Sequence, residues 1–319
     1  MKEEKYKDMK EQLIWGCLIH LSFNMWEEYI WPGRPFRGYR PDLELSETLW
    51  KDAIDLMGKS GVNMVVIDLG DAVKYKCHPE IAVNNAWTVA RLKQELHYIR
   101  SLGMEPIPKL NFSAGHDTWM KEYSKMVSTD EYYRFCSDMI AEVCEIFNHP
   151  RLFHIGMDEE GYLMQSTYKH VVVRKNEAWW HDFLFLVKEC EHHRAKAWLW
   201  PDYMLWHHPD QFFSRMPKTV MQSNWYYDEE FNPEWDMVRQ YIDLEKHGYD
   251  QILTGSYHYE NPKSIGNTVA FAEQYIGKQH LKGFLQTWWK PTVEENRERI
   301  LRAVSLIGEA RKAYNDRHP

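Results

Sequence analysis

The chain has 319 residues, of which 44% are hydrophobic, and its 47 acidic residues exceed its 39 basic ones, giving a formal net charge of -8. This length suits one large α/β domain with an ample core, and an acidic chain without a long basic cluster argues against a nucleic-acid partner. It contains no run of eighteen apolar residues, so we expect no membrane span. The first residues, MKEEK, lack the apolar segment of a secretion signal. We therefore expect a cytoplasmic protein; the alternative is a secreted or periplasmic one whose signal peptide has been removed.

Short apolar runs alternate with longer amphipathic stretches along the chain. The expected strands are 13–21, 62–69, 104–110, 152–157, 197–200, 219–223, 251–256 and 283–288. The expected helices are 46–59, 88–102, 130–147, 176–193, 209–215, 233–247, 265–276 and 293–314. Eight such units with right-handed crossovers form either a closed barrel or a doubly wound sheet. No G-x-G-x-x-G follows the first strand, so we predict a (β/α)8 TIM barrel that spans 1–319 as a single catalytic domain.

Three local features refine this prediction. Ser46, Thr129 and Thr292 precede expected helices and are candidate N-caps. One long irregular segment, 27–45, is rich in Pro and Gly and follows the first strand, so we expect it to lie over the catalytic mouth as a lid or wall. Four tryptophans fall in helical stretches and are expected in the core: Trp50, Trp87, Trp179 and Trp180. The five cysteines include no C-x-x-C pair, which fits reduced thiols better than a disulfide framework or a zinc ribbon.

The segment 151–160, RLFHIGMDEE, ends a strand-like run in three acids, Asp158, Glu159 and Glu160. In a barrel of parallel strands, this end opens onto the face where such enzymes keep their chemistry. Two carboxyl groups in different environments can be divided into a proton donor and an ionised stabiliser, as cleavage of a glycosidic bond requires. The alternative is a purely structural role, in which these acids stabilise the positive N-terminus of a following helix.

Aromatic, amide and acidic side chains recur where the other expected strands end. Aromatic rings stack on the apolar faces of sugars while amides and acids bind hydroxyls, so this mixture suits a carbohydrate pocket. The residues expected to contact substrate are His20, Asn24, Lys109, Asn111, His116, His154, Trp198, Trp200, Trp225, Trp288 and Lys290.

Four segments resemble the family 20 glycoside hydrolases, the β-N-acetylhexosaminidases. Segment 154–159, HIGMDE, resembles their H-x-G-G/A-D-E signature, and 108–116, PKLNFSAGH, resembles P-E-I-D-x-P-G-H with one residue inserted. Segment 256–261, SYHYEN, is similar to a strand-seven segment ending Y-L-D, and 283–290, GFLQTWWK, resembles the closing G-x-x-x-x-W-x-E strand. The matches come in the family's order over about the last two thirds of the chain.

The resemblance implies substrate-assisted retaining cleavage of a terminal 2-acetamido sugar, with a carbohydrate as the partner and no metal or organic cofactor. Glu159 would protonate the leaving oxygen, and the sugar's acetamido oxygen would attack the anomeric carbon. Asp158 would hold the acetamido nitrogen and stabilise the oxazolinium charge, and Tyr259 would bond the acetamido oxygen. Histidines at 116 and 154 would support the acids, and tryptophans at 198 or 200, 225 and 288 would wall the pocket. We expect the apolar pocket and Asp158 to raise the pKa of Glu159.

The chain departs from the family pattern at three positions. The arginine expected after the first strand is missing, and His20 and Asn24 stand there instead. Lys109 and Lys290 occupy positions where the motifs have Glu, so a less anionic pocket, tolerant of a sulfate, a carboxylate or another sugar epimer, is one interpretation. The other is that these lysines point away or pair with a local acid.

Three other functions remain open, as does the oligomeric state. A retaining glycosidase could use Asp68, Asp202 or Glu260 as its nucleophile. A non-catalytic carbohydrate-binding barrel would keep the aromatic residues without needing the acids. A metal-dependent hydrolase would want H-x-H on an early strand, which the sequence from His20 lacks, so we expect no metal.

Overall fold

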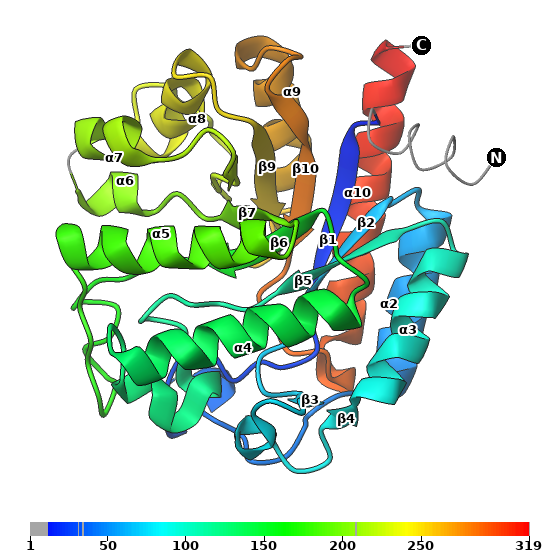
Figure 1. Ribbon diagram of the computed structural model, residues 1–319. Helices are drawn as coiled ribbons and strands as arrows, with labels where there is room; N and C mark the ends of the chain where they lie inside the picture. Colours follow the sequence, from blue (N-terminus) through cyan, green and yellow to red (C-terminus); the bar gives the residue numbers. More distant parts are fainter. Residues whose placement is uncertain (1–11, 31, 34, 208, 319) are drawn as a thin grey trace.

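Eight parallel strands close into a barrel in the computed structural model, which describes residues 12–30, 32–33, 35–207 and 209–318 (Figure 1). Around the barrel the strands follow the order β1-β10-β9-β8-β7-β6-β5-β2. Their bounds are β1 Ile14–His20, β2 Met64–Asp68, β5 Glu105–Lys109, β6 Leu152–Gly156, β7 Lys196–Leu199, β8 Met221–Gln222, β9 Gln251–Ser256 and β10 Leu281–Thr287. With helices between successive strands, this architecture confirms the predicted (β/α)8 TIM barrel.

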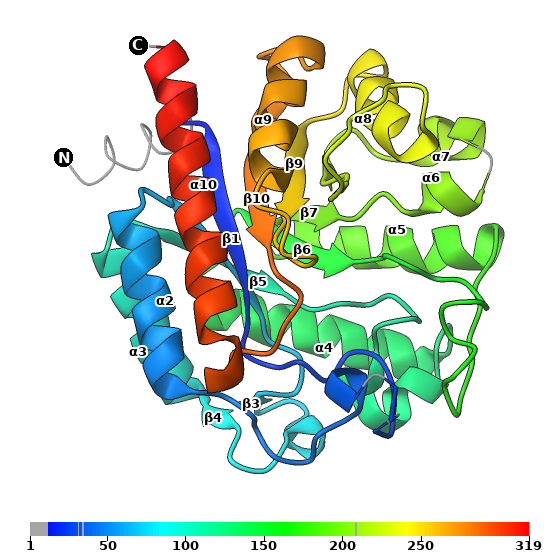
Figure 2. The same cartoon turned by 180° about the vertical axis from the view of Figure 1, so that it is seen from behind.

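Helices cover the outside of the barrel and bury their apolar faces against it (Figures 1 and 2). The α-helices are α2 Glu47–Lys59, α3 Val89–Ser101, α4 Asp130–Ile146, α5 Glu177–His192, α6 Tyr203–Trp206, α7 Pro209–Arg215, α8 Asp236–Lys246, α9 Ser264–Tyr275 and α10 Arg297–Arg317. Short 3-10 helices are η1 Pro35–Arg37, η2 Pro79–Ile81, η3 Thr118–Lys125 and η4 Glu294–Asn296. The tryptophans expected in the core, at 50, 87, 179 and 180, are all buried there. No helix among the described residues is both long enough and apolar enough to cross a bilayer.

Two of the three expected helix caps are present. The Ser46 hydroxyl accepts a hydrogen bond from the Leu49 N–H, and the Thr129 hydroxyl accepts one from the Tyr132 N–H. The third prediction was wrong, because α10 begins only after η4 and the Thr292 hydroxyl instead donates to the carbonyl of His20. Thr292 therefore fastens the loop after β10 to the end of β1 rather than starting a helix.

The loops that follow the strands gather at one end of the barrel, opposite the C-terminal end of α10 (Figure 2). A two-stranded sheet, β3 Val73–Lys74 with β4 Trp87–Thr88, lies there and was not expected from the sequence. The irregular segment 27–45 closes on itself where the Tyr39 N–H donates to the Glu27 carbonyl at 2.8 Å, and it is fastened to its surroundings where the Leu43 N–H donates to the Asn84 carbonyl at 3.0 Å. Of its described side chains, those of Phe36 and Arg37 reach the pocket at the carboxyl ends of the strands.

Candidate functional site

The backbone turns sharply where β6 ends. Gly156, Met157 and Glu159 have φ angles of +76°, +75° and +53°, in the left-handed region that side chains other than glycine seldom adopt. Glycine is required at the first of these positions, because a Cβ on Gly156 would lie 1.8 Å from Asn111 Oδ1. Neighbouring side chains on a straight strand would point to opposite faces, so this turn is what allows Asp158 and Glu159 to face the same space.

Asp158 is fixed from behind by the loop that follows β5. Asn111 Nδ2 donates to Asp158 Oδ1 at 2.8 Å, and the Ser113 hydroxyl donates to the Asp158 backbone carbonyl. The Asn111 side-chain oxygen also accepts from the Ser113 N–H at 3.0 Å, which ties the two anchors together. Because Asp158 is buried and held at both its backbone and its side chain, its carboxylate is preorganised.

Both acids converge on one imidazole. His116 Nε2 lies 3.2 Å from Glu159 Oε2 and 3.8 Å from Asp158 Oδ2. Burial lowers the pKa of His116, but the Asp158 charge and the hydrogen bond to Glu159 outweigh it and bring that pKa above its ordinary value. Burial likewise raises the pKa of Glu159, yet the His116 hydrogen bond and charge leave it below its ordinary value. The expected upward shift for Glu159 was therefore wrong, because sequence position does not reveal the histidine opposite it.

A third carboxyl group, Asp202, lies behind the site after β7. One of its oxygens accepts the Glu159 N–H at 3.2 Å and the other accepts Trp225 Nε1 at 2.8 Å. Burial, together with the charges of Asp158 and Glu159, raises the pKa of Asp202 far above its ordinary value. Asp202 thus supports the backbone of Glu159 and the ring of Trp225 through these two hydrogen bonds.

The acids open into an aromatic pocket of about 260 Å³. It is lined by Trp26, Phe36, Arg37, His116, Asp158, Glu159, Met164, Trp200, Trp225, Tyr227, His258, Tyr259 and Trp289. The hydroxyl of Tyr227 accepts a hydrogen bond from Trp289 Nε1 at 3.0 Å, so these two walls are fixed to each other. Aromatic faces around a pair of acids form the environment that binds and polarises a sugar ring.

Several of the residues expected from the sequence line this pocket, namely His116, Asp158, Glu159, Trp200, Trp225 and Tyr259. Tyr259 is 70% exposed and lies at the mouth of the pocket. Asn111 lies behind Asp158 rather than in the lining. The prediction that Trp288 lines the pocket was wrong, because its ring is buried in the hydrophobic core. Its neighbour Trp289, which has a φ of +43°, lines the pocket instead.

Four other expected contacts lie inside the barrel, buried beyond the reach of substrate. Lys109 Nζ donates to Asp68 Oδ2 at 2.6 Å, and His20 Nδ1 lies 3.3 Å from the same oxygen. His154 packs against the rings of Trp198 and Trp200. His20, Lys109, His154 and Trp198 are therefore corrected from substrate contacts to core residues, because they point into the barrel below its mouth.

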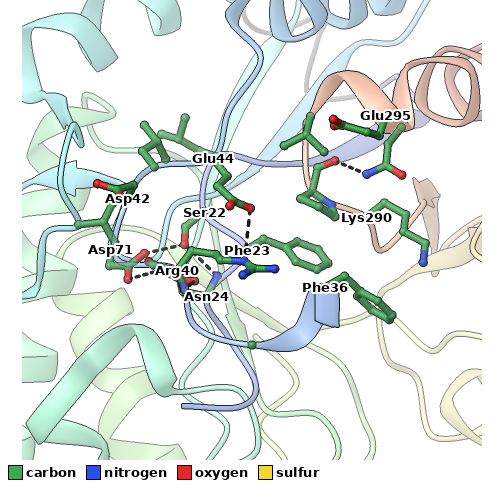
Figure 3. A pocket seen from close by; sticks show the side chains of 17 residues that line it. Ser22, Phe23, Asn24, Phe36, Arg40, Asp42, Glu44, Asp71, Lys290 and Glu295 are labelled. Carbon is green, nitrogen blue, oxygen red and sulfur yellow. Dashed lines mark hydrogen bonds and ion pairs between the residues drawn. The ribbon is translucent and has the colours of Figure 1, made fainter. Parts of the chain in front are cut away.

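Asn24 and Lys290 line a second, adjoining cavity of about 320 Å³, between the end of β1, segment 27–45 and the loop after β10 (Figure 3). Asn24 Nδ2 donates to Asp71 Oδ2 at 3.0 Å and to the Arg40 carbonyl at 2.8 Å, so it holds segment 27–45 in place. Phe36 lines both cavities and forms their common wall. Asn24 and Lys290 thus lie near the aromatic pocket but outside its lining.

Sequence reasoning missed several residues of the pocket: Phe36, Arg37, Met164 and Tyr227. Two of them lie on segment 27–45, whose composition indicated a wall over the mouth but not which side chains would face inward. Trp26 and His258 stood among the polar and aromatic residues at strand ends, a signal that could have found them. Met164 comes from the loop after β6, which carries no recognisable pattern.

Glu160, the third acid of the motif, is used structurally. Its carboxylate pairs with the buried guanidinium of Arg174, which also contacts Asp182 Oδ2 at 3.0 Å and donates to the Phe112 carbonyl at 2.9 Å. Glu160 Oε1 in turn accepts the Ala114 N–H at 3.1 Å. These contacts clamp the loop carrying Glu159 to the loop carrying His116.

A cation could in principle be held by the same three side chains. Among the described residues, His116, Asp158 and Glu159 offer ligand atoms that all lie within 4.8 Å of one another. A metal ion would have to displace the proton that both carboxylates favour on the imidazole. The arrangement is therefore better suited to holding and moving a proton.

No protein-family model and no curated protein matches the chain. Solved structures of family 20 glycoside hydrolases do resemble it, at low identity. A β-N-acetylglucosaminidase from Vibrio harveyi has a TM-score of 0.64 and 12% identity over 93% of this chain and 54% of its own. A β-N-acetylhexosaminidase from Streptomyces coelicolor has a TM-score of 0.64 and 13% identity, and the match covers 93% of this chain and 64% of that enzyme. Dispersin B has a TM-score of 0.60 and 14% identity, and the match covers 94% of this chain and 99% of dispersin B.

These comparisons confirm, at the level of the fold, the resemblance expected from the sequence motifs. The chain spans 54% of the Vibrio enzyme and 64% of the Streptomyces enzyme, which are longer proteins. Identities of 12% to 14% establish a common architecture and leave activity to be argued from the pocket itself.

Proposed function

We propose that the protein is a glycoside hydrolase that removes a terminal 2-acetamido sugar by substrate-assisted retaining catalysis. The observation that carries this proposal is that Asp158 and Glu159 converge on His116 in an aromatic pocket. Among its described lining residues, these two are the carboxylates. The similar family 20 structures are named as a β-N-acetylglucosaminidase and a β-N-acetylhexosaminidase, and they support the same reaction class.

Glu159 and His116 form the proton-handling pair. Their ion-pair contact of 3.2 Å is one across which a proton can move, and the raised pKa of His116 with the lowered pKa of Glu159 favours that proton on the imidazole. When a sugar displaces water, the charge separation becomes less favourable, and the proton passes to Glu159. Glu159 can then protonate the leaving oxygen as the glycosidic bond breaks.

Asp158 is suited to the acetamido group rather than to direct attack. In a retaining enzyme the nucleophile approaches the face opposite the leaving group. Here both carboxylates lie within 3.8 Å of a single imidazole nitrogen, on the same side of the pocket. Asp158 can accept the acetamido N–H and stabilise the positive charge that forms when the acetamido oxygen attacks the anomeric carbon.

The other carboxyl groups considered as nucleophiles are engaged elsewhere. Asp68 is paired with Lys109 inside the barrel, and Glu260 is paired with Arg299. Burial and the charges of Asp158 and Glu159 raise the pKa of Asp202, and its two oxygens accept the Glu159 N–H and the Trp225 Nε1–H within the wall of the site. The second candidate function is therefore a retaining glycosidase in which Asp158 is the nucleophile.

The decisive experiment compares substrates with and without the 2-acetamido group. We expect hydrolysis of nitrophenyl 2-acetamido glycosides, tight competitive inhibition by a thiazoline analogue of the oxazolinium ion, and about a hundredfold to thousandfold lower turnover in Asp158→Asn. Rapid hydrolysis of plain glucosides, no thiazoline inhibition and a trapped ester on Asp158 would instead establish the retaining alternative.

A further inference from the structure

His258 lines the aromatic pocket and is fixed there at both of its backbone polar groups. Its N–H donates to Ser256 Oγ at 3.0 Å, and its carbonyl accepts from Arg299 Nη1 at 2.9 Å. Its ring lies edge-on to that of Tyr259, with 4.6 Å between the ring centroids. Ser256 is itself tied to β10, because its hydroxyl donates to the Thr287 carbonyl at 3.1 Å. The imidazole of His258 therefore has a defined position before a ligand binds.

The ring of His258 carries a free hydrogen-bond acceptor. Burial, then the charge of Lys290, lowers its pKa below the ordinary value, although the Trp288 backbone and the charge of Glu159 act in the opposite direction. The ring is therefore neutral at neutral pH, and a neutral imidazole has one donor nitrogen and one acceptor nitrogen. The Trp288 carbonyl can engage only the donor. Nδ1 is buried without a hydrogen-bond partner, and no ion pair engages the ring within the described part of the chain.

Other polar groups around the same pocket are already engaged by the protein. The acid cluster is paired within itself, as its contacts with the imidazole of His116 show. Trp225 Nε1 donates to Asp202, and the positive charge of Arg37 acts on the nearby carboxylate of Glu159. The acceptor nitrogen of the neutral imidazole at 258 has no such engagement, so it can take a hydrogen bond from a hydroxyl of the sugar.

His258 and the two acids lie on different sides of the pocket mouth. The acids follow β6 and His258 follows β9, and β7 and β8 stand between these strands in the barrel. Trp200 and Trp225, which follow the two intervening strands, supply aromatic faces between the two positions. In the proposed mechanism the acids hold the edge of the sugar that carries its carbons C1 and C2. The opposite edge of a six-membered sugar ring, which carries C4 and C5, is then directed toward His258.

We propose that His258 accepts a hydrogen bond from the hydroxyl on C4 of the sugar and thereby determines which sugars are cleaved. This inference rests on the proposed function and adds a specificity-determining residue to it. C4 lies opposite C1 in the ring, and Glu159, which handles the leaving oxygen on C1, acts through its charge on the ring of His258 across the same pocket. A hydrogen bond depends on distance and direction, so inversion of the hydroxyl at C4 weakens this contact.

The contact is tested by removing the ring nitrogens and the sugar hydroxyl, separately and together. The parent substrate is the one that the wild type cleaves faster of nitrophenyl N-acetylglucosaminide and N-acetylgalactosaminide, which differ only at C4. Its 4-deoxy and 6-deoxy analogues complete the set, and kcat/KM is measured for each. His258→Phe keeps an aromatic ring against Tyr259 and removes both nitrogens.

We expect the two removals to be non-additive. In the wild type, loss of the 4-hydroxyl should lower kcat/KM about tenfold, and His258→Phe should lower it about tenfold on the parent substrate. On the 4-deoxy substrate the same substitution should cost less than about twofold, because the contact is already absent. The preference between the two C4 epimers should narrow in His258→Phe for the same reason.

A matched control makes the same exchange at the other end of β10. His280 precedes that strand, pairs with Glu245 and lines neither of the two cavities, so His280→Phe should affect the parent and 4-deoxy substrates equally. Coupling of His258 to the 6-hydroxyl, or an equal loss on all three substrates in His258→Phe, overturns the inference. Indifference of the wild type to the 4-hydroxyl overturns it too, and that result does not depend on the folding of any variant.

The outcome also separates this inference from the function beneath it. Hydrolysis of 2-acetamido glycosides at a rate independent of the 4-hydroxyl overturns the role of His258 and leaves the hydrolase intact. Failure of the wild type to hydrolyse any 2-acetamido glycoside overturns both.

Discussion

Two clusters in this barrel each pair a histidine with an aspartate, one at the mouth and one in the interior. At the mouth, His116 lies between Asp158 and Glu159. In the interior, His20 and Lys109 contact Asp68 at the carboxyl ends of β1, β5 and β2. Each cluster joins histidine to aspartate across neighbouring strands, yet their surroundings give them different chemistry.

The difference lies in charge balance and access. In the interior, burial raises the pKa of Asp68, but Lys109 and His20 outweigh it and lower that pKa to about 2. Asp68 and Lys109 therefore cancel each other, and the pair is closed to solvent. At the mouth, two carboxylates share one imidazole and Glu159 has a side chain that is 28% exposed, so a proton and a ligand can both reach it. A closed, neutral cluster supports the fold, whereas an open cluster with unbalanced charge can act on a substrate.

The sharpest test of this contrast removes the proton carried at the mouth. Glu159→Gln keeps the shape of the side chain but cannot donate a proton as an acid, so turnover of a substrate with a poor leaving group should fall by roughly two to four orders of magnitude. An acidic phenol leaves without protonation, so a nitrophenyl glycoside should lose much less. Steady-state kinetics on both substrates measures the two losses, and equal losses would show that Glu159 is not the acid.

The matching substitution in the interior should damage stability rather than the chemical step. Lys109→Met leaves Asp68 buried without its ammonium partner, which costs roughly 3–5 kcal/mol. Denaturant unfolding measures this cost. The double variant Asp68→Leu with Lys109→Met removes both charges and should recover most of the stability. If Lys109→Met instead kept full stability and altered the choice of substrate, the interior cluster would have to be counted as part of the site.

The sequence was sufficient for the fold because its information is periodic. Each expected strand overlaps a barrel strand, from β1 to β10, and the short pair β3 and β4 was missed because two-residue strands have no period to detect. The motif acids at 158 and 159 were also found, since their neighbours in the chain define the end of β6. At the end of β6, residues that are neighbours in the sequence are also neighbours in the site.

No sequence pattern indicates how deep in the barrel a side chain at a strand end lies. Lys109 is the last residue of its strand and Asn111 follows two positions later, yet the first points into the interior and the second supports Asp158. Trp288 and Trp289 exchange roles for the same reason, because a positive φ at the second residue changes which ring faces the pocket. Arg37 reaches the site from an irregular segment, where no pattern predicts direction.

The smallest expected effect concerns His116 and is read from pH dependence. The pair of Glu159 and His116 is active while it holds one proton, and the last proton leaves with an apparent pKa above that of either group alone. Because the pKa of His116 is raised, wild-type activity should persist through neutral pH and decline as pH rises past that raised value. In His116→Asn the proton belongs to Glu159 alone, so the basic limb of kcat/KM should move to lower pH. At neutral pH, activity should then fall about tenfold while activity near the new optimum recovers much of that loss. A rate profile displaced downward without any shift of its basic limb would mean that His116 only positions Glu159 and carries no proton.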